Sequence, residues 1–454
     1  MTPPSNGTAG DQREHGLRRQ LTAGQMAMVG VGGSIGTGLL LGSGAAMQIA
    51  GPAVILTFLA AAVITWTVTM AMAEMASVHP AAGSFGIYAE IYLNDWAGFV
   101  SRYGYWLAIA IAVGGELVAS ATYMAYWFPQ APRIAWVVLF AVLLLGINLR
   151  QVGDYGRAEY WMAMVKLVTI IAFVVIGAGL LLSSRVQPQY TAHGGFLPNG
   201  PASPLLAMSY ALFTFAGVEM VAISSGESRS RTEIPRAVLL TFALLTFVYM
   251  GAITVLVGVM PWHGAGVSES PFVTVFRHVG VPAAGHVMNF VVLSAALSGA
   301  NASLYVDSRT LFSLARGGYA PASLGKLTAA GAPLRALLVS SFGVIVALAM
   351  EKWAPRNAFV YILGAALFGA MLAWLAALAA HVRFRARLST EALSALPMRS
   401  PAGAAASVAG FVGIVIGIGA TWWVSSVTVL SGLVYLVVLT IAYFFMRPRA
   451  SSMA

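Results

Sequence analysis

The sequence predicts an all-α polytopic membrane protein, and three observations lead to this prediction. First, 59% of the 454 residues are hydrophobic and 9% are charged, with a mean hydropathy of +0.81, whereas soluble domains carry roughly 25% charged residues. Second, the apolar residues gather in twelve segments, each with about the 20 residues needed to span a bilayer. Third, clusters of glycine and small residues interrupt two of these segments.

The twelve expected transmembrane helices follow one another with short polar loops between them. They cover residues 22–50, 52–77, 97–128, 133–150, 159–183, 203–225, 236–260, 284–314, 335–353, 357–382, 404–424 and 426–446. An even number of spans places both termini on the same side of the membrane.

The distribution of Lys and Arg supports this count and orients the chain, because these residues are enriched in short cytoplasmic loops. With a cytoplasmic N-terminus, nineteen of the 25 Lys and Arg residues fall inside and five fall outside, and the remaining one, Lys166, lies within the fifth span. Both termini are therefore expected to be cytoplasmic. The polar residues 1–20 are expected to form a disordered cytoplasmic tail, since they lack a signal-peptide pattern.

The composition also excludes several classes of function. The formal net charge is +10, but the basic residues are scattered between apolar segments and form no patch for nucleic acid. The chain has no cysteine, which excludes disulfides, thiolate catalysis and cysteine-bound metals. Its seven histidines show no i, i+4 pairing that would suggest a metal or haem site. No enzyme activity, metal or cofactor is expected, and the expected partners are the lipid bilayer and a small molecule.

The first interrupted span contains GVGGSIGTGLLLGSG at residues 30–44, with seven glycines in fifteen residues. Each glycine inside a helix costs up to about 1 kcal/mol relative to alanine, so a simple membrane anchor gains nothing from them. Small-xxx-small helix packing accounts for two pairs of these glycines. The whole cluster favours a helix that unwinds at the middle of the membrane, where its free backbone groups line a polar cavity.

A second interruption lies in FTFAGVE, residues 213–219, within the sixth span. Breaks in spans one and six are typical of a 5+5 inverted-repeat transporter fold, in which the substrate site lies at the breaks. The sequence thus predicts a single transmembrane transporter domain over residues 21–447. Its expected parts are repeat one at about 22–183, repeat two at about 203–382, and two extra C-terminal helices at about 404–446.

The broken helices suggest the chemistry of the substrate. The half-helix that starts near Gly38 presents the positive end of its dipole and its free amides to an anion. Carbonyl groups released near Ser34 and Ile35, and at Phe213–Ala216, can accept hydrogen bonds from a cation. A site with both features fits the zwitterion of an α-amino acid.

A few ionisable residues lie inside the expected spans, where a charge is costly unless it is paired or hydrated. Glu116, Lys166 and Glu219 lie in the middle of their spans, and Glu116 with Lys166 could also be a buried ion pair that only locks helices together. Glu74 is expected to have a helix-packing role near the cytoplasmic gate, with contact to the substrate as the alternative. Asp307 is expected near the membrane surface at the end of span eight.

Several long motifs resemble the bacterial amino-acid transporter (AAT) family of amino-acid permeases, within the amino acid–polyamine–organocation (APC) superfamily. The resemblance extends over nearly the whole chain. Its strongest segments are GGSIGTGLLLGSG (32–44), AEMASVHPAAGSFGIYAEIYLNDWAGF (73–99), FTFAGVEMVAISSGES with the following IPRA (213–237), SESPFVTVF (268–276) and LYVDSRTLFSLARGGYAP (304–321).

The resemblance implies roles for particular residues. The substrate carboxylate would bind the backbone and hydroxyl around Thr37 and Gly38. The ammonium group would bind the backbone carbonyls of Ser34, Ile35, Phe213 and Ala216. Glu116 would match the third-helix acid of many members, and Lys166 the fifth-helix lysine that takes the place of a sodium ion in related transporters. Phe213 and Phe215 are candidate gates, although packing at a helix interface explains them equally well. The implied substrate-binding residues are Ser34, Ile35, Gly36, Thr37, Gly38, Phe213, Phe215, Ala216 and Glu219.

One motif departs from the family pattern. Before the fifth span the chain reads GRAEYW, and Arg157 replaces an acid that many members carry. This puts the charge network on the cytoplasmic side in doubt, but it leaves the substrate site unaffected.

The resulting prediction is a transporter of the cell inner (plasma) membrane that takes up neutral amino acids, hydrophobic or aromatic, by proton-coupled symport with alternating access. The coupling ion would be the proton. Glu116 would carry it, because removal from water favours the neutral carboxyl group, while Lys166 would make sodium unnecessary. A sodium-independent exchanger, or a permease for 4-aminobutyrate, proline or cationic amino acids, remains an alternative.

Overall fold

The computed structural model describes residues 22–79, 84–148, 155–183, 186–223, 233–280, 282–328 and 332–446. The described part of the chain is a bundle of α-helices joined by short loops and contains no β-strand. The predicted tail, residues 1–20, lies outside the described residues, as does the side chain of Arg157.

The first half of the chain folds into the helices that carry the first break. The first expected span consists of two α-helices joined by a short break and a π-helical turn. The elements are α2 (Ala23–Ser34), η1 (Gly38–Gly42), α3 (Ser43–Ala50), η2 (Gly51–Ala53), α4 (Val54–Val78), α5 (Ser84–Tyr92), α6 (Asp95–Ala125), α7 (Arg133–Asn148) and α8 (Tyr155–Leu182).

The second half of the chain carries the second break, between α10 and α11. The elements are α9 (Ser203–Leu206), α10 (Met208–Phe215), α11 (Met220–Ile223), α12 (Glu233–Val259), η5 (Trp262–Gly264), α13 (Pro271–His278), α14 (Pro282–Arg316), η6 (Ala322–Gly325), α15 (Leu334–Ser340), α16 (Phe342–Trp353), α17 (Ala358–Ala386), α18 (Thr390–Ser394), α19 (Gly403–Val424) and α20 (Ser426–Met446).

The positions of the helices agree closely with the twelve expected spans, since each span falls on one helix or on a broken helix. Nine helical stretches of the described chain are long and apolar enough to cross a membrane, and Met26–Val78, at 53 residues, has the length for two crossings. The apolar helix Arg133–Asn148 is shorter. The number of twelve crossings stays a prediction.

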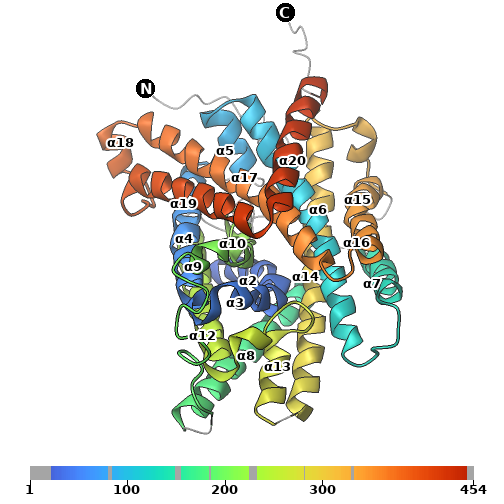
Figure 1. The fold of residues 1–454 in the computed structure, drawn as a ribbon. Helices are drawn as coiled ribbons and strands as arrows, with labels where there is room; N and C mark the ends of the chain where they lie inside the picture. The colour runs from blue at the N-terminus through green and yellow to red at the C-terminus, as the bar shows by residue number, and fades with distance from the viewer. Residues whose placement is uncertain are drawn as a thin grey trace, which may run out of the picture.

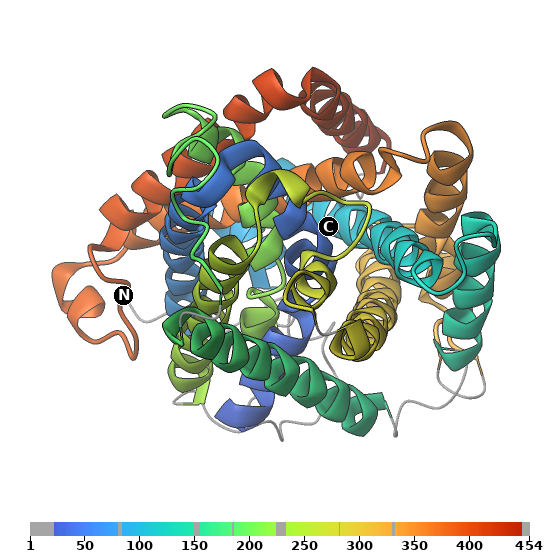
Figure 2. The ribbon, with the colours of Figure 1, turned by 60° about the horizontal axis from the view of Figure 1, so that its bottom comes forward.

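The first broken helix lies in the middle of the bundle. Two views of the ribbon show α2 and α3 surrounded by helices from both halves of the chain (Figures 1 and 2). The long helix α6 packs against both α14 and α17, and α12 packs against α2, α4 and α8. The broken helices are therefore held within a frame of long, continuous ones.

The two C-terminal helices lie on the outside of this frame. Figure 2 shows the two C-terminal helices, in red, along one edge of the bundle. They carry large apolar side chains with no protein cover, such as Trp423 and Phe445, which are 77% and 85% exposed. Such surfaces suit contact with lipid.

Glycines bring α6 unusually close to its neighbours. A methyl group added at Gly343 of α16 would lie 1.8 Å from the carbonyl oxygen of Ala110, and one added at Gly369 of α17 would lie 2.6 Å from that of Gly104. Membrane helices use small residues in this way, because close backbone approach increases van der Waals contact. Helix α6 is thereby fixed in position, and with it the depth of Glu116.

Candidate functional site

The first break separates α2 from the π-helical turn η1. Regular helix ends at Ser34, and Ile35 and Gly36 bend out of it before Thr37 resumes helical geometry. The break thus falls within the glycine-rich stretch, where the backbone has the least preference for helix.

The second break separates α10 from α11. Residues 216–219 form turns in place of helix, and Gly217 has a φ of +103°. A residue with a side chain is strained in this region of φ, so glycine is the residue suited to this turn.

The two breaks touch each other through their backbones. A Cβ atom placed on Gly217 would lie 2.7 Å from the carbonyl carbon and oxygen of Gly33 and 2.9 Å from the nitrogen of Ser34. Met220, at the start of α11, presses on Gly33 from the same side, since its sulfur would lie 2.5 Å from an added Cβ. Segments that are far apart in the sequence therefore meet at one point inside the bundle.

Glu116 reaches the first break from the middle of α6. Its Oε1 accepts a hydrogen bond from the backbone N–H of Thr37 at 3.3 Å and lies 2.8 Å from the position of an added Cβ on Gly36. Its Oε2 is buried and has no hydrogen-bond partner among the described residues. A carboxyl group therefore lies beside the Thr37 amide, which the family resemblance predicts to bind the carboxylate of the substrate.

Lys166 of α8 binds the same break on the side of α2. Its Nζ donates a hydrogen bond to the carbonyl oxygen of Gly32 at 3.3 Å, and the side chain is buried. A buried acid and a buried base thus hold the backbone on either side of Ser34 and Ile35.

Glu219 plays a comparable part at the second break. One carboxyl oxygen accepts the backbone N–H of Gly217 at 2.9 Å, and the other accepts the hydroxyl of Tyr105 at 3.0 Å. Its side chain is 2% exposed. Both oxygens already have partners, so Glu219 presents no unpaired oxygen to a cationic side chain in this conformation.

Two of the four backbone carbonyls predicted to bind an ammonium group already accept hydrogen bonds. The Ser34 carbonyl accepts the hydroxyl of Tyr249 at 2.7 Å, and the Phe213 carbonyl accepts the N–H of Ala216 at 3.0 Å. A carbonyl oxygen has two lone pairs, so each can accept a second donor.

The two candidate gates lie on opposite faces of α10. Phe213 faces the first break, since its Cδ1 would be 3.1 Å from a Cβ on Gly38. Phe215 is fully buried, with its ring 5.0 Å from that of Tyr249 and 6.5 Å from that of Phe58. Phe213 is therefore beside the break, whereas Phe215 packs between α4 and α12.

Glu74 lies away from the breaks, in a buried cluster between α4 and α17. It accepts hydrogen bonds from Nε and Nη2 of Arg385 at 2.8 and 3.0 Å, and from the backbone N–H of Ser400. His381 Nε2 is 3.3 Å from the same carboxyl group. This geometry fits the expected helix-packing role.

The depth predicted for Asp307, near the membrane surface, stays a prediction. Its side chain is 0% exposed inside the protein. The reason is that helices far from it in the sequence, α6, α15 and α20, place Tyr105, Ser340 and Tyr435 near it.

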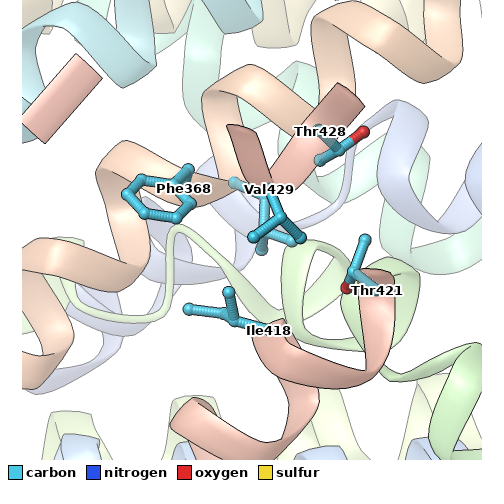
Figure 3. A pocket seen from close by; sticks show the side chains of 7 residues that line it. Phe368, Ile418, Thr421, Thr428 and Val429 are labelled. Carbon is cyan, nitrogen blue, oxygen red and sulfur yellow. The ribbon is translucent and has the colours of Figure 1, made fainter. Parts of the chain in front are cut away.

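The break residues are enclosed by the protein. Ser34, Ile35 and Thr37 are at most 4% exposed, so an amino acid could reach them only after neighbouring helices moved. Figure 3 shows a hollow elsewhere, between α17, α19 and α20. It is lined by Gly364, Leu367, Phe368, Ile418, Thr421, Thr428 and Val429.

The sequence did not reveal the roles of Tyr105, Tyr249 and Gly217 at the site. Both tyrosines lie within apolar spans, where a hydroxyl needs a hydrogen-bond partner. This need was the one sign in the sequence that they have a structural role. Which partner each would find depends on helix rotation, which no local pattern reveals.

The site consists of two broken helices that touch through their backbones and are held by buried acidic and basic side chains. This arrangement is that of a membrane transporter. Comparison with known proteins then places it more closely. The chain matches the amino acid permease family over residues 25–449 and belongs to that family. Its members are transporters and not enzymes.

Several curated relatives are about one third identical to the chain. It is 32% identical over 393 residues to the uncharacterized amino acid permease YtnA of Bacillus subtilis, covering 85% of each chain. It is 33% identical over 399 residues to the gamma-aminobutyric acid permease of the same organism, covering 86% of this chain and 84% of the relative. It is 34% identical over 382 residues to the aromatic amino acid transport protein AroP of Escherichia coli K12, covering 83% and 84%.

A solved structure supports the fold. The crystal structure of the Eremococcus coleocola manganese transporter, in complex with an aromatic bis-isothiourea substituted compound, aligns with a TM-score of 0.58 over 93% of this chain and 92% of that chain. The sequence identity is 14%, so this likeness concerns the fold alone.

Proposed function

We propose that the protein takes up neutral amino acids, with hydrophobic or aromatic side chains, by symport with protons across the bacterial inner membrane. Both termini would be cytoplasmic. The observation that carries the proposal is the junction of the two breaks, where backbone amides and carbonyls lie beside Glu116 and Lys166.

The geometry of this junction suits the common part of all α-amino acids. In the proposed cycle the carboxylate of the substrate takes the Thr37 amide from Glu116, and the ammonium group binds the carbonyls near Ser34 and Phe213. Glu116 leaves as the neutral acid, because a charged carboxyl without a partner is costly inside the membrane. Proton binding and substrate binding at the first break would then be linked.

The preference for neutral substrates follows from Glu219. Both of its oxygens accept hydrogen bonds from the protein, and Glu116, the other acid at the breaks, is neutral in the proposed cycle. Neither acid would therefore offer a free carboxylate to the side chain of lysine or arginine. The similarity to AroP supports an aromatic substrate. The similarity to the gamma-aminobutyric acid permease makes 4-aminobutyrate the second candidate.

A thermal-shift screen of all amino acids on the purified protein identifies the substrate, since a ligand at 100 times its dissociation constant adds about 2.7 kcal/mol of stability. Uptake of radiolabelled L-phenylalanine is then measured in proteoliposomes that are acidic outside and neutral inside, with choline replacing sodium. A proton moving inward supplies about 1.4 kcal/mol per pH unit.

We expect accumulation that a protonophore abolishes and that does not need sodium. Uptake that requires sodium and ignores the pH gradient would contradict proton coupling. Transport that occurs only against preloaded amino acid would instead identify an exchanger.

A further inference from the structure

Asp307 is a buried acid that the proposed transport site does not use. Its side chain is 0% exposed, and neither carboxyl oxygen accepts a hydrogen bond of regular geometry from the described residues, although the hydroxyl of Ser340 lies close enough to donate one. A carboxylate in such a place would exchange its hydration for at most one neutral hydroxyl, at a cost of several kcal/mol. The neutral acid avoids this cost.

Three hydroxyl groups among the described residues lie near Asp307, and all three are uncharged. Tyr105 of α6, Tyr435 of α20 and Ser340 of α15 lie near it. The hydroxyl of Tyr435 donates to the carbonyl of Gly104 at 2.5 Å, and the hydroxyl of Ser340 accepts Nε1–H of Trp106 at 2.9 Å. These groups do not supply a charge that would balance a carboxylate.

Two arginines are close in sequence to these residues, Arg309 to Asp307 on α14 and Arg102 to Tyr105 on α6. Both have other contacts. The guanidinium of Arg309 lies 3.2 Å from the ring centre of Tyr305 and donates to the carbonyl of the same residue. Arg102 forms an ion pair with Glu90. A proton is therefore the cation best suited to neutralise Asp307, since it needs neither space nor additional ligands.

Tyr105 connects Asp307 with the second break. Its hydroxyl, near Asp307, donates a hydrogen bond to Glu219 at 3.0 Å, and Glu219 in turn accepts the N–H of Gly217. Along α14, Asp307 lies eight residues beyond Gly299, the glycine that faces Glu116, a distance of about 12 Å at the rise of an α-helix. Asp307 is thus a separate site, displaced from Glu116 toward the end of α14 that we predict to be cytoplasmic.

We propose that Asp307 is a second proton-binding site, which holds a proton in this closed conformation and releases it when the transporter opens toward the cytoplasm. The step is a simple acid dissociation, in which the carboxyl O–H bond breaks and the proton passes to water. Tyr105 links this site to Glu219, so movement of the second break alters the surroundings of Asp307. The part played in transport rests on the proposed function above, whereas proton binding itself does not.

Infrared difference spectroscopy of the purified protein tests proton binding directly, with pH as the only variable. We expect wild type to show a carbonyl band of a protonated carboxyl group that disappears at alkaline pH, and Asp307→Asn to lack this band. Asp307→Glu should restore a titrating band. Asp95→Asn, which changes an exposed acid at the start of α6, should give the wild-type spectrum.

A second measurement tests the role in transport. In proteoliposomes, proton uptake and L-phenylalanine uptake are recorded together, and Asp307→Asn should lower the number of protons taken up per substrate without loss of substrate binding. Identical infrared titrations of wild type and Asp307→Asn would overturn the proton site, as would a band that pH does not change. An unchanged proton ratio would overturn its role in coupling. If wild type takes up no protons, the proposed function fails, while the infrared result still decides the state of Asp307.

Discussion

Gly217 is the residue at which the two broken helices meet. It has a left-handed φ of +103°, and it also lies against the backbone of Gly33 and Ser34. Any side chain here meets two separate obstacles, one conformational and one steric. The residue determines how closely α10–α11 can approach α2.

Substitution Gly217→Ala should therefore destabilise the protein more than an ordinary glycine replacement. Strain at this φ costs about 1–3 kcal/mol, and overpacking against a backbone that cannot move aside adds about 1–3 kcal/mol. Gly195→Ala is the matched control, because Gly195 has a φ of +87° but nothing within 4 Å of an added Cβ. Thermal unfolding in detergent should show a clearly larger loss for Gly217→Ala, and equal losses would contradict the contact between the breaks.

Glu116→Gln tests the acid on the first break. The oxygen of the glutamine side chain can still accept the N–H of Thr37, but it cannot carry a proton, so substrate binding should survive while accumulation driven by a pH gradient is lost. The measurements are thermal shift with L-phenylalanine and uptake into proteoliposomes. Glu391→Gln, an exposed acid in α18, serves as the control, and gradient-driven accumulation by Glu116→Gln would exclude Glu116 as the proton carrier.

Helix α17 connects α6 in the core with the Glu74 cluster and the loop before α19. Its first part packs against α6, and near its end Arg385 and His381 surround Glu74 of α4. The N–H of Ser400 binds the same carboxyl group, which ties the start of α19 to this cluster. A change in the angle between α4 and α17 must disturb these contacts.

Arg385→Met should cost about 3–5 kcal/mol of stability, since it leaves the carboxylate of Glu74 buried without its main partner. Glu74→Gln should cost less, because the side chain of Arg385 is 19% exposed and can turn toward water, whereas that of Glu74 is 0% exposed. The double variant should recover part of the loss of Arg385→Met. Thermal unfolding of wild type, the two single variants and the double variant measures this double-mutant cycle. Arg383→Met, which changes an exposed neighbour, is the control. Additive losses of stability would show that Glu74 and Arg385 are not coupled.

The sequence predicts features that depend on neighbouring residues, and it does not predict contacts between helices that are distant in the chain. The helices and both breaks follow from local patterns, because apolar length and glycine clusters act on nearby backbone. The contact of Glu116 with Thr37 and the burial of Asp307 depend on helices distant in the sequence, α6 in one case and α15 and α20 in the other. Their rotation and depth are set by packing, which a single sequence does not display.

At the scale of the whole molecule, the distribution of the basic residues predicts the orientation of the chain in the membrane. The protein contains no cysteine, so an introduced cysteine is the only thiol available for labelling. This makes the predicted topology directly measurable without first altering the natural chain.

We expect a membrane-impermeant maleimide to label Thr191→Cys in intact bacterial cells and to leave Thr390→Cys unlabelled. Both positions are exposed in the structure, and they lie in loops predicted to be outside and inside. Both variants should be labelled after the cells are broken, which controls for reactivity. The opposite pattern in intact cells would reverse the orientation of the protein.

The use of main-chain groups at the breaks has an evolutionary consequence. The donors on Thr37 and Gly217 belong to the peptide backbone, so genetic drift in side chains cannot remove them. If the proposed binding mode holds, recognition of the amino-acid head group can persist while the surrounding side chains diverge toward new specificities. Proline is the exception, because it lacks the N–H. In a saturation mutagenesis screen with growth on the imported amino acid, Thr37→Pro should be lost while several other replacements at Thr37 survive. Survival of Thr37→Pro would show that selection does not act on this amide.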